Sequence, residues 1–446
     1  MIELAAPVER ALLIGVQLKR AGGRADAGAR GVGSTPGPTR GQVMAEHLEE
    51  LGELVDTAGG VVVGQLTQQV DRPNPATYLG KGKIEELQQL IADTDASLVI
   101  FDDELTPAQG KNIEDATGKR VMDRAELILD IFATRARSSE AKMQVELAQL
   151  QYMLPRLMRM WSHLEKFRGG IGVRGPGETQ LEIDRRLINT RIKVLKHRLG
   201  EVHKSRITQR TSRKNQFRAS LVGYTNAGKS SVLKGLSGAD AIFVEDRLFA
   251  TLDPLTREIF LAENTSLLLT DTVGFIRKLP HNLVASFRAT LEEITEADLL
   301  VHVIDVSHPQ WEEQRSVVDE VLAELGAKGT PVLHVFNKID RVPEEERTAI
   351  QARLSRLLPG SVFVSAVASD GLEPLMRALL VVARERTPVT EIRLQLSDGK
   401  MLAELHREAE VLDQTHEGEE IVVRARLGEA LAGRLRRAGA SVTGAK

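Results

Sequence analysis

The stretch Gly223-Tyr224-Thr225-Asn226-Ala227-Gly228-Lys229-Ser230-Ser231 indicates the fold of the central part of the chain. It matches G-x-x-x-x-G-K-[ST], follows the strand pattern 218–222 and opens a helical pattern, which is the context that a phosphate-binding loop requires. Backbone N–H groups of such a loop and of the following helix N-terminus cradle phosphates. We therefore expect residues 223–231 to bind phosphates, with Lys229 on the β- and γ-phosphates and the Ser230 hydroxyl on Mg²⁺.

Two further segments have the pattern of nucleotide switches. Asp271-Thr272-Val273-Gly274 follows an apolar strand pattern, so its carboxylate can hold a Mg²⁺-bound water and the Gly274 amide can sense the γ-phosphate. Phe249-Ala250-Thr251-Leu252-Asp253 lies between this motif and the phosphate loop. Thr251 is the candidate second hydroxyl on Mg²⁺, ordered only while γ-phosphate is present, and an ordinary surface threonine is the alternative.

Asn337-Lys338-Ile339-Asp340 ends a strand pattern and predicts the base. The Asp340 carboxylate only accepts hydrogen bonds, so it pairs with the N1–H and 2-amino donors of guanine, whereas adenine would leave a buried charge unpaired. Ser365-Ala366-Val367 follows the next strand and is expected to close on the guanine carbonyl. The sequence thus predicts a protein that binds GTP and GDP in preference to ATP.

The machinery for hydrolysis is less complete than that for binding. In Ras-like switches a glutamine that orients the attacking water follows the D-x-x-G glycine, and here that position is Phe275. We expect slow basal turnover, with a partner or a cation completing the site. Asn226 is a candidate K⁺ ligand, and a loop-shaping role is the alternative.

Strand patterns alternate with helical patterns on both sides of a long helical region. The fold class is therefore α/β, with a Ras-like P-loop G domain preceded by a small parallel α/β domain and a long helical hairpin. A small C-terminal α/β domain follows, with a helix expected near 400–412. The expected parts are 1–40, an N-terminal strand and Gly-rich flexible segment; 41–136, the N-terminal α/β domain; 137–216, the hairpin; 217–386, the G domain; and 387–446, the C-terminal domain.

The predicted hairpin is basic within an acidic chain. Residues 135–218 hold 20 Lys and Arg against 7 Asp and Glu, whereas the remainder holds 39 against 55. Such a segment is expected to contact a polyanion. Pro155 should kink or divide its first helix. Glycine and arginine crowd the loop 168–177, which predicts an RNA-binding probe, with a flexible connector as the alternative. The residues concerned are Arg168, Gly169, Gly170, Gly172, Arg174, Gly175 and Gly177.

Composition excludes several classes of site. The 446 residues include no cysteine, which excludes disulfides and Cys-based zinc sites, and the ten histidines show no metal-ligand spacing. The sequence has no apolar run of membrane-spanning length, and its start lacks a signal pattern. We expect a cytoplasmic monomer without stable membrane insertion, with ribosome association or transient membrane association as further possibilities.

The strings GYTNAGKSS, FATLDPLTR, DTVGFIRKLPHNLVASFRATLEE and FNKID, preceded by GGIGVRGPGETQLEIDRR, resemble the HflX family of ribosome-associated GTPases. The resemblance extends from about Thr77 to Ala366, and a hydrophobic residue at Phe275 also fits it. It implies binding to the large ribosomal subunit, with the glycine-rich loop directed at its rRNA near the peptidyl-transferase region. It further implies dissociation of stalled or idle 70S ribosomes into subunits.

Two other functions are compatible with the sequence. A regulatory GTPase would recruit a protein effector, such as a membrane protease, and its basic segment would be a solvated coiled coil. An RNA-remodelling ATPase would use Gly80-Lys81-Gly82-Lys83 ahead of a helix. A turn followed by a basic helix start explains that string without any function.

Overall fold

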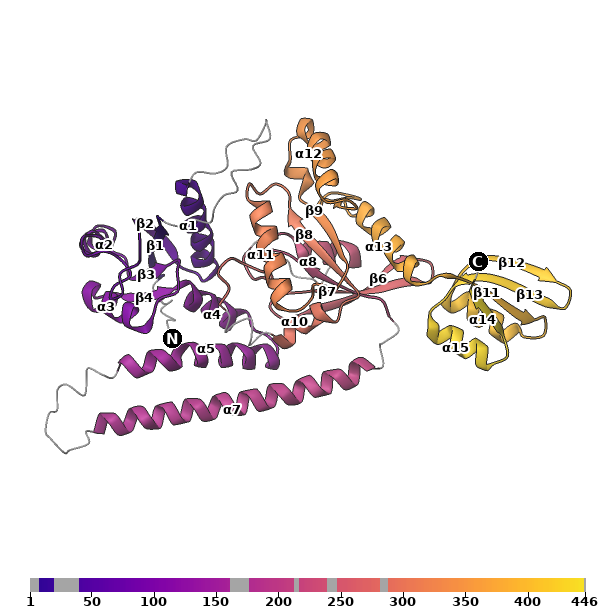
Figure 1. Cartoon of the computed structure of the whole chain (residues 1–446), viewed down its shortest axis with the longest axis horizontal. Helices are drawn as coiled ribbons and strands as arrows, with labels where there is room; N and C mark the ends of the chain where they lie inside the picture. Colours follow the sequence, from indigo (N-terminus) through magenta and orange to yellow (C-terminus); the bar gives the residue numbers. More distant parts are fainter. Residues whose placement is uncertain are drawn as a thin grey trace, which may run out of the picture. The chain divides into compact units, whose positions relative to one another are not determined.

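The computed structural model describes residues 8–19, 40–160, 176–211, 216–238, 247–280 and 288–444 (Figure 1). The chain divides into two compact units. The first comprises Met1–Glu201 with the short stretches Arg247–Phe249 and Lys278–Phe287. The second comprises Val202–Asp246, Ala250–Arg277 and Arg288–Lys446.

The first unit contains a parallel sheet of order β2-β1-β3-β4. Its core is built from the short apolar runs of these strands and from the facing sides of α1 to α4. All four residues of β3 are buried, as expected for a strand covered on both faces. The elements are β1 (Arg10–Leu18), α1 (Arg40–Thr57), β2 (Val61–Val70), α2 (Lys81–Thr94), β3 (Leu98–Phe101), α3 (Pro107–Thr117), β4 (Arg120–Asp123) and α4 (Arg124–Arg135).

The Gly80-Lys81-Gly82-Lys83 string forms an ordinary helix start. Gly80 is the N-cap of α2 with extended backbone, and the Lys83 ammonium lies 2.7 Å from the Glu86 carboxylate one turn later. An i, i+3 ion pair of this kind is typical of a helix surface. The ion pair within α2 therefore explains Lys83 as an ordinary helix-surface residue.

Two long helices follow, α5 (Ser139–Met160) and α7 (Pro176–Thr211), and they lie side by side in Figure 1. α5 and the part of α7 up to Glu201 belong to the first unit. Leu147, Ile192 and Leu195 form the buried seam between them, and Arg191 pairs with Glu146 beside it. The expected division at Pro155 is wrong, because α5 continues through this proline. Most of the predicted RNA-binding loop, residues 168–175, lies outside the described residues.

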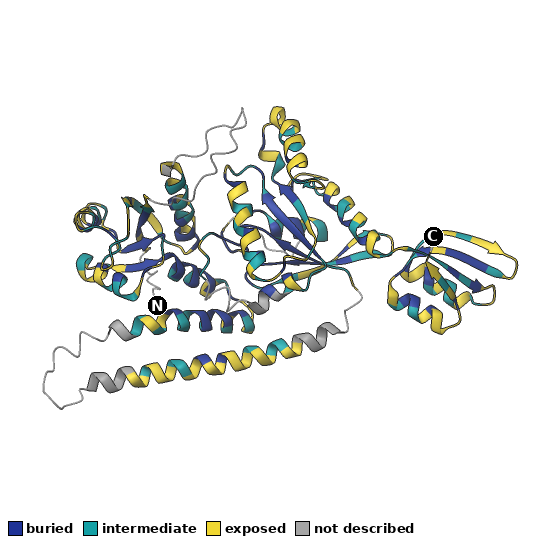
Figure 2. Ribbon diagram, in the orientation of Figure 1, coloured by how far each residue is buried: buried dark blue, intermediate teal, exposed yellow. Residues whose placement is uncertain are grey.

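The second unit contains a six-stranded sheet of order β10-β9-β8-β5-β7-β6, parallel except for the β6–β7 pair. Its central strands are buried on both faces (Figure 2). The elements are β5 (Arg218–Val222), α8 (Lys229–Ser237), β6 (Leu255–Ala262), β7 (Thr265–Asp271), α10 (Arg288–Thr295), β8 (Leu299–Asp305), α11 (Trp311–Glu324), β9 (Val332–Asn337), η1 (Ile339–Arg341), α12 (Glu344–Leu357), β10 (Val362–Phe363) and α13 (Glu373–Arg386). The predicted nucleotide motifs follow the carboxyl ends of β5, β7, β9 and β10, where open parallel sheets bind ligands.

The C-terminal part has β-α-β-β-α-β order and an antiparallel sheet β12-β13-β11-β14, which is a split βαβ arrangement. Its elements are β11 (Val389–Gln395), α14 (Gly399–Glu408), β12 (Glu410–Glu417), β13 (Glu420–Arg426), α15 (Glu429–Arg437) and β14 (Ser441–Gly444). The helix expected near 400–412 ends at Glu408, so that boundary is wrong. Pairing of Val411 with Ala425 makes the following residues a strand.

No helix within the described ranges is both long and apolar enough to cross a lipid bilayer.

Candidate nucleotide-binding site

The phosphate loop joins β5 to α8 and encloses a buried lysine. Lys229 is 6% exposed, and its ammonium donates to the backbone carbonyls of Gly223 at 3.2 Å and Tyr224 at 3.0 Å. Gly228 caps α8 with φ 93°, and a side chain there would collide with the Asn337 amide nitrogen. The loop therefore requires glycine at position 228, both for its backbone conformation and for space.

Three oxygen-bearing side chains from separate segments converge beside this loop. The Ser230 hydroxyl lies 2.6 Å from the Asp271 carboxylate, and Thr251 lies 2.9 Å from the same carboxylate oxygen and 2.8 Å from Ser230. The other carboxylate oxygen of Asp271 is buried and has no hydrogen-bond partner among the described residues. Hard oxygen donors and an unused carboxylate oxygen suit Mg²⁺. These residues, separated by up to 41 positions in the chain, thus form a cluster that fits the ion.

The D-x-x-G segment is fastened to the phosphate loop by backbone. Thr225 N–H donates to the Phe275 carbonyl at 2.7 Å, and Phe275 N–H donates to the Gly223 carbonyl at 3.1 Å. A Cβ on Gly274 would lie 2.9 Å from Thr225 Cα and 3.0 Å from the Lys229 ammonium. The Phe275 ring is fully buried. The position of the water-orienting glutamine is therefore occupied by a side chain that is apolar and turned into the core.

Burial perturbs the two charges of the site. Desolvation lowers the pKa of Lys229 to about 8, and Asp271 opposes this only in part. Burial also raises the pKa of Asp271, although Lys229 and the Ser230 and Thr251 hydroxyls oppose the shift. Both groups carry a desolvation cost that a bound polyphosphate with its cation would reduce.

The base motif is held by Asn337, which is 1% exposed. Its amide donates to the Ala227 carbonyl at 2.9 Å and accepts from Ala366 N–H at 3.1 Å. Asn337 therefore bridges the phosphate loop and the Ser365-Ala366-Val367 loop. The Asp340 side chain is exposed at the start of η1, where its carboxylate can accept from a purine.

Asp305 at the end of β8 is a site residue that the sequence reasoning missed. Its carboxylate lies 2.8 Å from the Lys338 ammonium and accepts from the Ser307 hydroxyl at 2.6 Å. Lys338 has φ 62°, so the ion pair helps to fix a backbone turn that lysine rarely adopts. The sequence signal that could have identified Asp305 is its position directly after the strand pattern 299–304.

The remaining predicted residues occupy varied positions around the loop. Asn226 is exposed with φ 59°, a conformation that asparagine tolerates, so the loop-shaping alternative has a structural basis. Thr272 is buried and donates to the Leu221 carbonyl at 2.6 Å. Buried positions also include Ala227, Phe249, Leu252 and Val273; Ser231, Asp253 and Ile339 are half-buried, and Ala250 and Val367 are exposed.

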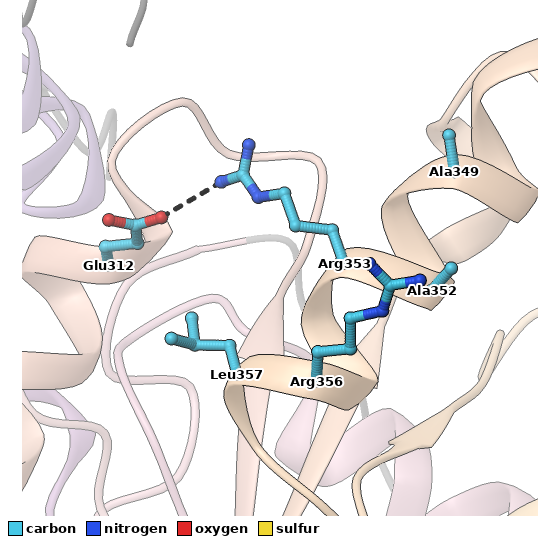
Figure 3. A pocket seen from close by; sticks show the side chains of 6 residues that line it. All are labelled: Glu312, Ala349, Ala352, Arg353, Arg356 and Leu357. Atoms are coloured by element: carbon cyan, nitrogen blue, oxygen red, sulfur yellow. Dashed lines mark hydrogen bonds and ion pairs between the residues drawn. The ribbon is translucent and has the colours of Figure 1, made fainter. Parts of the chain in front are cut away.

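A hollow of about 640 Å³ lies between α11 and α12 and is separate from these motifs. Figure 3 shows the Arg353 guanidinium reaching Glu312 across it, at 3.1 Å. Arg356, Leu357 and two alanines complete the lining. None of the predicted nucleotide-binding residues lines this hollow.

Three protein-family models match consecutive parts of the chain. Residues 45–133 match a model described as GTP-binding GTPase N-terminal, and residues 135–213 match GTP-binding GTPase middle region. Residues 218–338 match a model described as 50S ribosome-binding GTPase.

Named relatives resemble most of the chain. The protein called GTPase HflX of Caldanaerobacter subterraneus subsp. tengcongensis is 51% identical over 353 residues, 78% of this chain and 78% of that protein. The one of Escherichia coli is 43% identical over 364 residues, 81% and 85% of the two chains. A crystal structure of a complex of SsGBP and GDP is 27% identical and covers 84% of this chain and 98% of that one, with a TM-score of 0.45.

Affinity for GDP should fall as the pH rises through the lowered pKa of Lys229. Bound phosphates favour the charged ammonium and raise this pKa, so binding takes up a proton above about pH 8. The last phosphate ionisation of GDP has a pKa of about 6, so the charge on the phosphates stays constant above pH ~7. Between about pH 7 and pH 9 the dissociation constant of GDP should therefore increase about tenfold. Titration calorimetry in buffers of different ionisation enthalpy should show proton uptake at the upper pH. Equal affinities across this range would contradict the expectation.

Asp340→Asn should change the preferred base. The amide presents a donor where guanine also has donors, so GDP affinity should fall at least about 100-fold. Xanthine carries a carbonyl in place of the 2-amino group, so affinity for xanthosine diphosphate should rise. Glu344→Gln, an exposed acid of α12, is the control and should leave both affinities unchanged. Wild-type affinity of Asp340→Asn for GDP would remove Asp340 from the base site.

Proposed function

The chain belongs to the HflX family of GTPases, and we propose that it is a GTP-hydrolysing switch that binds the large ribosomal subunit and dissociates stalled or idle 70S ribosomes. Family and fold together support GTP hydrolysis and a ribosome-associated GTPase. Our proposal adds three properties to this: binding to the large ribosomal subunit, dissociation of 70S ribosomes, and stimulation of GTP hydrolysis by ribosomes.

The observation that best supports a nucleotide switch is the convergence of Ser230, Thr251 and Asp271. Mg²⁺ held there would neutralise charge on the β- and γ-phosphates. Lys229 would bind the same phosphates, and the Gly274 amide would report the γ-phosphate. Loss of that phosphate would remove the group that Thr251 and Mg²⁺ hold together, which is how such a segment would sense the nucleotide.

The ribosomal partner is supported by charge. Exposed basic side chains line α7, among them Arg185, Arg186, Lys193, Lys196 and Arg198. Such a helix suits the phosphate backbone of rRNA, whose binding releases counterions. Arg168 and Arg174, outside the described residues, are proposed to extend this contact from the glycine-rich loop.

An incomplete catalytic site links the two parts of the proposal. The buried, apolar Phe275 cannot orient a water, so hydrolysis needs a group from elsewhere. Docking on the large subunit would order the switch segments and supply that group. GTP turnover would then follow ribosome binding.

Large ribosomal subunits should stimulate GTP turnover, and the double variant Arg168→Ala, Arg174→Ala should lose the stimulation with basal turnover intact. Raising the salt concentration should weaken the effect in the wild type, because phosphate contacts are screened. Arg353→Ala, Arg356→Ala removes the same charge from α12 and is the matched control. Retained stimulation in the loop variant would remove the loop from the contact.

Sedimentation of 70S particles with protein and GTP separates splitting from mere association. Appearance of free subunits supports splitting. Unchanged particles, combined with no stimulation of turnover, would instead favour the regulatory GTPase that recruits a protein effector.

Turnover should be faster in KCl than in NaCl if Asn226 ligates K⁺. Asn226→Gly keeps the positive φ of this position without strain but removes the side-chain oxygen, so it should abolish the difference between the salts. Equal wild-type rates in the two salts would exclude the K⁺ site and leave Asn226 with the loop-shaping role.

A further inference from the structure

Two short stretches beside the switch motifs belong to the first compact unit. Arg247–Phe249 and Lys278–Phe287 are part of that unit, whereas Ala250–Arg277 is part of the second. Phe249 precedes Thr251 by two positions, and Lys278 follows Gly274 by four. The chain therefore passes from one unit to the other immediately beside both motifs.

Lys278 completes a half-buried charge cluster of the first unit. Its ammonium lies 2.5 Å from Asp102 and 2.6 Å from Asp103. Asp102 is almost fully buried, and its other oxygen accepts from Arg124 at 2.7 Å, while Arg124 also pairs with Glu50. Lys278 is thus an ion-pair partner of both aspartates, whereas Arg124 pairs with Asp102 and Glu50. Loss of the ammonium would leave the two neighbouring carboxylates with less opposite charge to offset their repulsion.

The cluster lies where an open parallel sheet receives a ligand. Asp102 and Asp103 directly follow β3, and the strand order reverses between β1 and β3. The crevice at such a reversal, outside the carboxyl ends of the strands, is the usual binding position. His47, 3.8 Å from Asp102, faces the same group. The ammonium of Lys278 thus lies at this edge of the sheet, against the two aspartates that follow β3.

Phe249, beside the other switch motif, is the second residue that contacts the first unit. Its ring is buried and packs edge-on against Phe132, with ring centroids 4.7 Å apart and an interplanar angle of 87°. Phe249 and Lys278 have φ values of 54° and 53°, which residues other than glycine adopt rarely. Backbone turns of this kind persist where surrounding contacts hold them.

We propose that Lys278 is a positioning residue for GTP hydrolysis, acting through its ion pairs with Asp102 and Asp103. Arg277 N–H donates to the Tyr224 hydroxyl at 3.0 Å, and this hydrogen bond restricts the conformation of the chain between Gly274 and Lys278. The ion pairs hold this segment in the arrangement in which Gly274 packs on Lys229. A γ-phosphate then meets an ordered amide. GDP, which lacks that phosphate, gains nothing from the ordering.

The inference rests on the proposed GTPase action, and Lys278→Met in the full chain tests it. The ratio of affinities for a non-hydrolysable GTP analogue and for GDP should fall about tenfold, and turnover should fall with it, while GDP affinity stays unchanged. Lys278→Arg keeps the charge and should retain most of the affinity ratio and most of the turnover. Lys19→Met removes an exposed lysine that pairs with Asp71 in the same unit and should change neither.

Wild-type affinity ratio and turnover in Lys278→Met would overturn the proposal. Equal weakening of the GTP analogue and GDP, with a lower melting temperature, would also overturn it, since the lysine would then serve stability alone. Asp103→Asn, at a partly exposed position, covers the case in which Lys278→Met does not fold, and should shift the ratio in the same direction by a smaller factor. Absence of turnover in the wild type, with or without ribosomal subunits, would sink the GTPase proposal instead, because the binding ratio still tests Lys278.

Discussion

Close backbone packing around the phosphate loop is the constraint on which the rest of the nucleotide site depends. Gly228 lies against the Asn337 amide, and Gly274 lies against Thr225 and Lys229, with no room for a Cβ at either position. The base motif and the switch motif therefore both contact the loop directly. Displacement of any one of the three segments has to disturb the other two, because packed interiors do not deform continuously.

Desolvation sets the chemistry within this packing. The ammonium of Lys229 and the carboxylate of Asp271 are both buried, and each has a pKa shifted toward its neutral form. Hydroxyl groups from Ser230 and Thr251 satisfy one carboxylate oxygen and leave the other without a partner among the described residues. Charge is thus concentrated where phosphates and a hard cation would bind, while the apolar Phe275 leaves the attacking water without an orienting group.

The two predicted switch motifs lie directly beside points where the chain passes between its two compact units. Phe249 and Lys278 join the parallel-sheet unit, whereas Thr251 and Gly274 join the nucleotide unit. Phe249 lies two positions before Thr251, and Lys278 lies four positions after Gly274. In the proposed switch, contacts of these two residues would therefore act on their neighbours along the chain, without any change in the core of either unit.

The sequence by itself determined the motifs and the strands that carry them, because each motif is a local string with a local mechanism, and it predicts the base preference. It also determined the basic hairpin and its apolar seam, since helical periodicity is local too. Of the two outcomes expected at Pro155, a kink or a division, the division is wrong, because α5 runs through the proline. The sequence also misjudged the end of α14, where strand pairing overrode helix propensity. Only the tertiary structure decided that Asn337 bridges two loops, that Asp305 holds Lys338 and that Lys278 meets Asp102. Those contacts join residues between 29 and 176 positions apart, with the Asn337–Ala366 contact nearest and the Lys278–Asp102 contact farthest, and long-range pairing of charges and amides leaves no periodic trace in a single sequence.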